Sequence, residues 1–140
     1  MKLRNKFTNG IVLILIGLLH TQCVLTNFQP QFKGFSESWF FNISKGIEEL
    51  PAAVGKTDFE SFATFWFFYF GLLIIPIGFL VHSIERKKGI LPFSFTLSYL
   101  IVVLIGAYMV PNSGMTFIML PHALYMLISS LIKQKKAKNC

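Results

Sequence analysis

Two histidines, His20 and His122, have the side chains best suited to chemistry, because each lies inside a long apolar stretch of the sequence. A neutral imidazole can donate and accept hydrogen bonds, carry a proton or ligate a metal. A polar side chain within an apolar span is costly, so it marks a candidate functional site. Each histidine lies about eight residues, roughly 12 Å at helical rise, from the same end of its span. We expect the two imidazoles to approach each other if their helices pack together.

Three interpretations of the two histidines stay open. The first is interhelical hydrogen bonding that holds a helical bundle together. The second is a polar pocket for a lipid, a quinone or a small substrate. The third is ligation of a haem iron or another metal by both imidazoles, although no further metal-ligand spacing supports such a site. The candidate ligand-binding residues are His20, Gln22, Trp66, Tyr69, Tyr108, His122 and Tyr125. We predict no resident cofactor, with haem or quinone at His20 and His122 as the alternative.

The motifs of several common enzyme chemistries are missing from the sequence. There is no Cys-x-x-Cys pair for thiol exchange, no glycine loop to hold a phosphate and no His-Glu-x-x-His zinc motif. The two cysteines, Cys23 and Cys140, are too few for a disulfide framework. We therefore predict no catalytic residues and favour a protein without enzymatic activity.

Polar residues near the ends of the second apolar stretch have structural interpretations. Thr57, Asp58 and Glu60 match a capping box, in which a hydroxyl and a carboxylate accept hydrogen bonds from the free amides of a helix start. His82 lies beside charged residues at the other end of the stretch, where headgroups and water can reach it. We interpret His82 as an interfacial residue.

Four apolar stretches dominate the 140-residue chain, which is 54% apolar and has a mean hydropathy of +0.60. A helix needs about 20 such residues to cross the hydrocarbon core of a bilayer. The predicted spans are residues 7–28, 61–83, 90–110 and 114–132, and a basic tail, 133–140, follows them. The turn between the last two spans is so short that these helices must be antiparallel neighbours. In the connection 29–60, Trp39, Phe40, Phe41 and Ile43 suit either a short interfacial helix or a loop packed on the bundle.

Basic residues are distributed unequally between the two sides of these predicted spans. Lysines and arginines stay preferentially on the cytoplasmic side of a membrane. The side of the predicted spans with more basic residues is therefore expected to be cytoplasmic, which makes both termini cytoplasmic and 29–60 external. They are also not gathered into one patch, which argues against a nucleic-acid partner. Ten lie on one side, Lys2, Arg4, Lys6, Arg86, Lys87, Lys88, Lys133, Lys135, Lys136 and Lys138, and three on the other, Lys33, Lys45 and Lys56.

Three short motifs carry a resemblance to a known family. They are Gly17-Leu18-Leu19-His20, Phe65-Trp66-Phe67, and Pro111-Asn112-Ser113-Gly114 leading to Pro121. With these motifs the whole chain resembles the small four-helix bacterial integral membrane proteins grouped as a family of unknown function. In architecture it is also similar to DoxX-like proteins, although it lacks the cysteines expected of their redox-associated members. The resemblance implies the bacterial inner membrane and implies no activity.

Together these observations predict an all-α, polytopic membrane protein with four transmembrane helices in an antiparallel bundle. We expect a non-enzymatic binding or accessory protein with a polar pocket in the outer leaflet for a lipid-like ligand or a partner. Its partners are then the lipid bilayer and either a second copy or another membrane protein. The alternatives are a membrane redox component that binds haem or quinone through His20 and His122, and a small oligomeric transporter.

Overall fold

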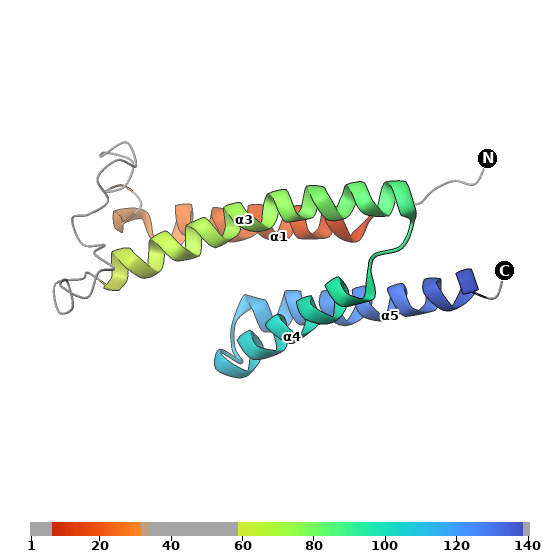
Figure 1. Ribbon diagram of the computed structural model, residues 1–140. Helices are drawn as coiled ribbons and strands as arrows, with labels where there is room; N and C mark the ends of the chain where they lie inside the picture. Colours follow the sequence, from red (N-terminus) through yellow and green to blue (C-terminus); the bar gives the residue numbers. More distant parts are fainter. Residues whose placement is uncertain (1–6, 32, 34–58, 139–140) are drawn as a thin grey trace, which may run out of the picture. The chain divides into compact units, whose positions relative to one another are not determined.

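The computed structural model describes residues 7–31, 33 and 59–138, and all regular structure in these ranges is helical (Figure 1). The elements are α1 (Asn9–Asn27), α3 (Phe59–Lys88), α4 (Phe93–Met109), the π-helix η2 (Met115–Met119) and α5 (Leu120–Lys138). The predicted all-α class is confirmed for these residues. The proposed interfacial segment at Trp39–Ile43, the basic residues Lys45 and Lys56 and most of the capping box lie outside the described residues.

Contacts divide the chain into two units, 1–12 with 78–140 and 13–77. Helices α1 and α3 both run across this division. Three helical segments are long and apolar enough to cross a membrane: Asn9–Asn27, Ala63–Lys88 and Thr116–Ala137. Helix α4, the third predicted span, is equally apolar but has 17 residues, a length of about 25 Å. It begins after Pro92 and ends before Pro111, which explains why it is shorter than the predicted 90–110.

Glycines bring α1 and α3 close together, and the two helices lie side by side in Figure 1. In the first unit, a Cβ added to Gly10 would stand 2.6 Å from the Cα of His82. In the second unit, a Cβ added to Gly17 would stand 2.8 Å from the carbonyl oxygen of Gly71. Both distances are below the 3.4–4 Å of ordinary van der Waals contact. The contacts at these positions are therefore between backbones, which only residues without a side chain permit.

Antiparallel packing accounts for the spacing of these glycines. Gly10 and Gly17 are seven residues apart on α1, and Gly71 and Gly78 are seven apart on α3. Seven residues make about two helical turns, so each pair lies on one face of its helix. One more step of seven leads to Val24 on α1 and Thr64 on α3, which are both buried.

The segment between α3 and α4 reverses the chain with a positive-φ glycine. Gly89 has φ 77°, and its amide donates to the carbonyl of Glu85 at 2.9 Å, as in helices that end on a left-handed residue. The carbonyl of Leu91 then accepts hydrogen bonds from Ser130 Oγ at 2.8 Å and Gln134 Nε2 at 3.3 Å. This segment is thereby tied to the C-terminal half of α5.

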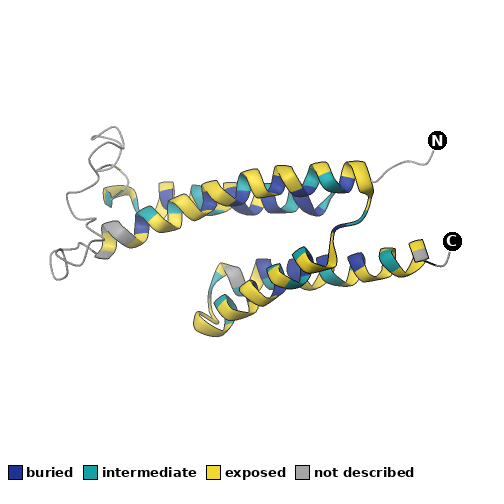
Figure 2. Ribbon diagram, in the orientation of Figure 1, coloured by how far each residue is buried: buried dark blue, intermediate teal, exposed yellow. Residues whose placement is uncertain are grey.

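Helices α4 and α5 pack against each other as an antiparallel hairpin, as the short turn at 111–114 predicts. The buried residues of α4 are Thr96, Leu100 and Val103. The buried residues of α5 and the turn before it include Met119, Ala123, Met126 and Ser130. Figure 2 shows buried residues along one side of the helices and many exposed residues on their other sides.

Candidate functional site

His122 is a buried polar residue of the α4–α5 hairpin, with 8% of its surface exposed. Its Nδ1 lies 3.4 Å from the hydroxyl oxygen of Tyr99 on α4. The two rings meet edge to face with centroids 5.9 Å apart, and Tyr99 itself stacks on Phe95 at 6.4 Å. The other ring nitrogen of His122, Nε2, is buried and has no hydrogen-bond partner in the described part of the chain.

A second contact of the hairpin fixes the register that brings Tyr99 to His122. Leu91 lies eight residues before Tyr99, and its partner Ser130 lies eight residues after His122. Equal steps in opposite directions are what two antiparallel helices require, because both rise by the same amount per residue. The pairing of Tyr99 with His122 therefore follows from the packing of the whole hairpin.

The helix around His122 is irregular. The π-helical turn η2 ends at Met119, and α5 begins at Leu120, so Pro121 falls in the first turn of α5. Helical structure is continuous from η2 into α5, and Pro121 has no amide hydrogen to donate to the turn before it. π-Helical turns occur often at functional sites. His122 thus lies directly after a break in regular helical winding.

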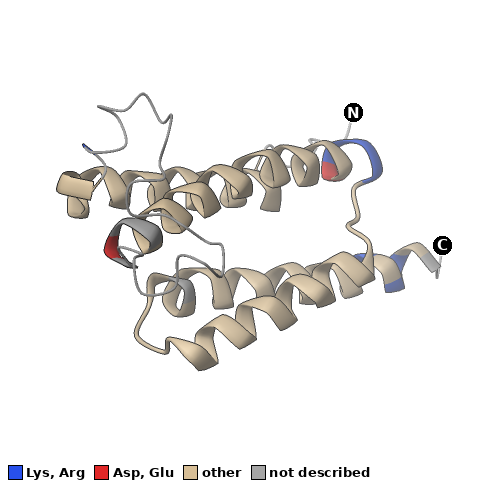
Figure 3. Ribbon diagram, turned by 60° about the vertical axis from the view of Figure 1, so that its left-hand side comes forward, with Lys and Arg blue, Asp and Glu red and all other residues tan. Residues whose placement is uncertain are grey.

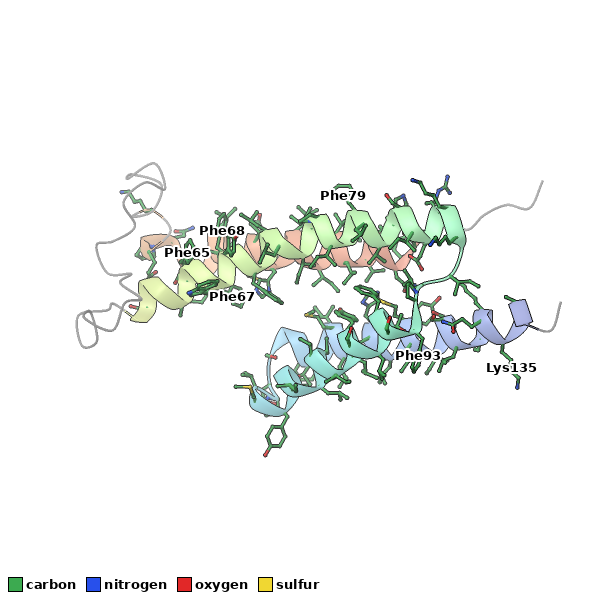
Figure 4. The ribbon with its side chains drawn as sticks, in the orientation of Figure 1. Phe65, Phe67, Phe68, Phe79, Phe93 and Lys135 are labelled. Atoms are coloured by element: carbon green, nitrogen blue, oxygen red, sulfur yellow. The ribbon has the colours of Figure 1, made fainter. Side chains whose placement is uncertain are left out.

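His20 has an aromatic environment in the second unit. Its ring stacks on Phe67 of α3 with centroids 3.7 Å apart and an interplanar angle of 24°, and it meets the edge of Phe70 at 5.5 Å. Figure 4 labels Phe67, which lies on the opposite side of α3 from Phe79. The Nε2 atom of His20 is buried without a hydrogen-bond partner among the described residues, as is that of His122. The expected approach of the two imidazoles stays a prediction, because they belong to different units.

The other candidate ligand-binding residues lie largely at the helix surfaces. Trp66 and Tyr69 form an edge-to-face pair at 6.0 Å on α3 and are about two-fifths exposed. Gln22 is exposed on α1, and Tyr108 and Tyr125 are 89% and 64% exposed. Tyr99, which the sequence analysis did not select, is the tyrosine that contacts His122. Counting outward from the turn at 111–114 pairs His122 with Val103, one helical turn away from Tyr99.

A second polar cluster joins the start of α1 to the last turns of α3. Glu85, which is 9% exposed, accepts a hydrogen bond from Asn9 Nδ2 at 2.6 Å and one from the amide of Gly10 at 3.3 Å. Thr8 Oγ1 lies 2.7 Å from His82 Nδ1 and 3.4 Å from the amide of Ile11, which it caps. A carboxylate at a helix amino terminus also interacts favourably with the helix dipole. Every polar group named here has a partner, so we interpret this Glu85 cluster as structural: its hydrogen bonds join α1 to α3.

The exposed basic residues that the structure describes in the first unit lie at one end of it. Leu91 follows Lys88 by three residues and is bonded to Ser130 and Gln134, so the last turns of α3 and of α5 are at the same end. Figure 3 shows the lysines and arginines at the end of α3 and along the end of α5. They are Arg86, Lys87, Lys88, Lys133, Lys135 and Lys136, all exposed.

Groups of three or more His, Cys, Asp or Glu side chains that could hold a metal ion are not found in the ranges that the structure describes. Among protein families, a family of unknown function, DUF6463, matches residues 4–133. The chain belongs to this family. The DUF6463 match covers both histidines, Tyr99 and the Glu85 cluster, and it confirms the expected membership of a family of unknown function. The likeness to DoxX proteins stays a prediction. No curated protein and no solved structure matches the chain.

Proposed function

We propose that this DUF6463 protein is an integral protein of the bacterial inner membrane, with α1, α3, α4 and α5 crossing the bilayer and both termini in the cytoplasm. The length and apolar character of the helices support this, together with the large apolar side chains that they expose. A soluble monomer rarely exposes apolar patches of this extent. The basic residues at one end of the first unit fit the cytoplasmic side.

Within that membrane protein, the proposed function is non-enzymatic binding of a small apolar ligand at a buried imidazole. The observation that carries this proposal is His122 Nε2, a buried polar atom without a partner among the described residues. A buried polar group that lacks its hydrogen bond costs about 1–3 kcal/mol. A ligand that bonds to Nε2 removes this cost.

A comparison of free energies argues against interhelical hydrogen bonding as the whole role of His122. Its contact with Tyr99 is long, at 3.4 Å, and hydrogen bonds between transmembrane helices average about 0.6 kcal/mol. That gain is smaller than the cost of the orphaned Nε2. An apolar side chain of similar size would fill the same space without this cost. His20, whose Nε2 is also orphaned, is a second candidate for the same role.

Native mass spectrometry and an absorption spectrum of gently extracted protein test the proposal. We expect the wild type to retain a stoichiometric bound molecule that His122→Leu loses. His82→Leu serves as the matched control, because it removes the imidazole that is bonded to Thr8 and leaves Tyr99 and His122 in place. A wild type without ligand, together with a His122→Leu variant that is more stable than wild type, would contradict the proposal. A haem absorption band lost in both His20→Leu and His122→Leu would instead favour the redox alternative.

A further inference from the structure

The contact between Tyr99 and His122 assigns the proton on the imidazole. A neutral imidazole carries one proton, so one ring nitrogen donates and the other accepts. The Tyr99 hydroxyl has one proton to donate, and Nδ1 of His122 lies within its reach at 3.4 Å. A lone pair on an imidazole nitrogen is a stronger acceptor than a phenol oxygen, so Tyr99 donates to Nδ1. The proton of His122 is then on Nε2.

The opposite arrangement leaves more groups without partners. If Nδ1–H donated to Tyr99, the phenol proton would have no acceptor among the described residues, and Nε2 would be a buried lone pair without a donor. If Tyr99 is the donor, then of the donors on Tyr99 and His122 one, Nε2–H, lacks an acceptor among the described residues. Buried polar groups are overwhelmingly hydrogen-bonded in native structures, which favours the arrangement with fewer unmet groups.

Resting on the proposed function, we propose that His122 Nε2–H donates a hydrogen bond to a carbonyl oxygen of the apolar ligand, and that Tyr99 is the positioning residue that fixes this tautomer. A donor requires an acceptor on the ligand, and a carbonyl oxygen is the acceptor that apolar molecules most often carry. Many of the buried residues of this hairpin are apolar, among them Val103, Met119, Ala123 and Met126. A ligand bound within such an apolar hairpin needs a surface that is otherwise hydrocarbon, as in a quinone or the acyl ester of a lipid.

The tautomer is measured by nitrogen NMR of protein that carries labelled histidine, with the His122 signals assigned by their loss in His122→Leu. We expect the proton of wild-type His122 to be on Nε2. In Tyr99→Phe, we expect the ratio of the Nδ1–H tautomer to the Nε2–H tautomer to rise at least threefold. Tyr125→Phe is the matched control, because Tyr125 is a 64% exposed tyrosine of the same hairpin. A wild-type His122 that carries its proton on Nδ1 would overturn the inference and leave ligand binding itself untouched.

The ligand class is tested with probes that differ in the acceptor. A monoacylglycerol ester and its ether analogue, which lacks the carbonyl, are compared by titration calorimetry in micelles of a detergent without carbonyl groups, with decyl-benzoquinone as the quinone arm. We expect the ester or the quinone to bind at least tenfold more tightly than the ether, and His122→Leu to abolish that difference. Equal binding of all three probes overturns the carbonyl assignment. Failure of all three, with a retained native molecule that has no carbonyl group, overturns it as well.

Discussion

Placing a methyl group between α1 and α3 should destabilise the protein in proportion to how closely the two backbones approach. In Gly10→Ala, the new Cβ would stand 2.6 Å from the Cα of His82 and closer still to the amide nitrogen of His82 and the carbonyl oxygen of Gly78. Carbon atoms in contact prefer about 3.5–4.0 Å. The helices must therefore separate by about 1 Å, because the atoms in the way belong to the backbone and have no rotamer to change.

The magnitude follows from three contributions. Overpacking costs typically about 1–3 kcal/mol, and a gap of about 1 Å loses up to roughly half of the dispersion energy of the atoms beside it. Replacing glycine with alanine offsets about 0.5–1 kcal/mol of this loss, because glycine loses more conformational entropy than alanine when a helix forms. We expect Gly10→Ala to lower the free energy of unfolding by about 2 kcal/mol. For Gly17→Ala we expect about 1 kcal/mol, because one of its near neighbours is the movable Cγ1 of Ile75, at 2.8 Å.

The assay is reversible unfolding in mixed micelles, with dodecyl sulfate as the denaturant and circular dichroism as the signal. Gly114→Ala is the matched control, because a Cβ at Gly114 meets nothing within 4 Å. That variant should be neutral or more stable by up to about 1 kcal/mol. Equal stability of Gly10→Ala and Gly114→Ala would refute the close approach of α1 and α3.

Three further outcomes are expected. Glu85→Ala should cost about 2 kcal/mol in the same unfolding assay, because Asn9 Nδ2 and the Gly10 amide lose their acceptor, whereas Glu85→Gln keeps one acceptor oxygen and should cost less. Ser130→Ala should cost about 1 kcal/mol, because its hydroxyl donates to the linker between α3 and α4. In a chain without its native cysteines, Lys45→Cys and Lys136→Cys should react with a membrane-impermeant thiol reagent from opposite sides; labelling from one side would contradict the proposed orientation.

Hydropathy and helix-breaking residues predicted the helices but not the contacts between them. The predicted first span, 7–28, agrees with α1 to within two residues at its start and one at its end. Helix α3 extends past the predicted 83 to Lys88. Pro92 and Pro111 bracket α4, and both could be read from the sequence because proline interrupts a helix locally.

Contacts depend on which way each helix is turned, and an apolar helix carries little information on that point. Successive side chains are about 100° apart around a helix, so lipid-facing and protein-facing positions can be equally apolar. The seven-residue spacing of Gly10 with Gly17 and of Gly71 with Gly78 was a usable signal for the α1–α3 contact. Tyr99 gave no such signal, because counting outward from the turn at 111–114 pairs His122 with Val103 instead. Glu85 could not be paired with Asn9 without knowing that the two helix ends meet.

The hydrogen bonds of the Glu85 cluster depend on the order in which the chain is synthesised. Asn9 and Gly10 are made early, but the carboxylate that accepts their hydrogen bonds comes 75 residues after Gly10, near the end of α3. Until the ribosome has passed that point, the start of α1 lacks this acceptor, although Gly71 and Gly78, which pack against its glycines, have already been made. The hydrogen bonds at the start of α1 thus form only after Glu85, close to the end of α3, has been made. A nascent chain that stops before Glu85 should therefore leave the Asn9 side chain and the Gly10 amide without their acceptor.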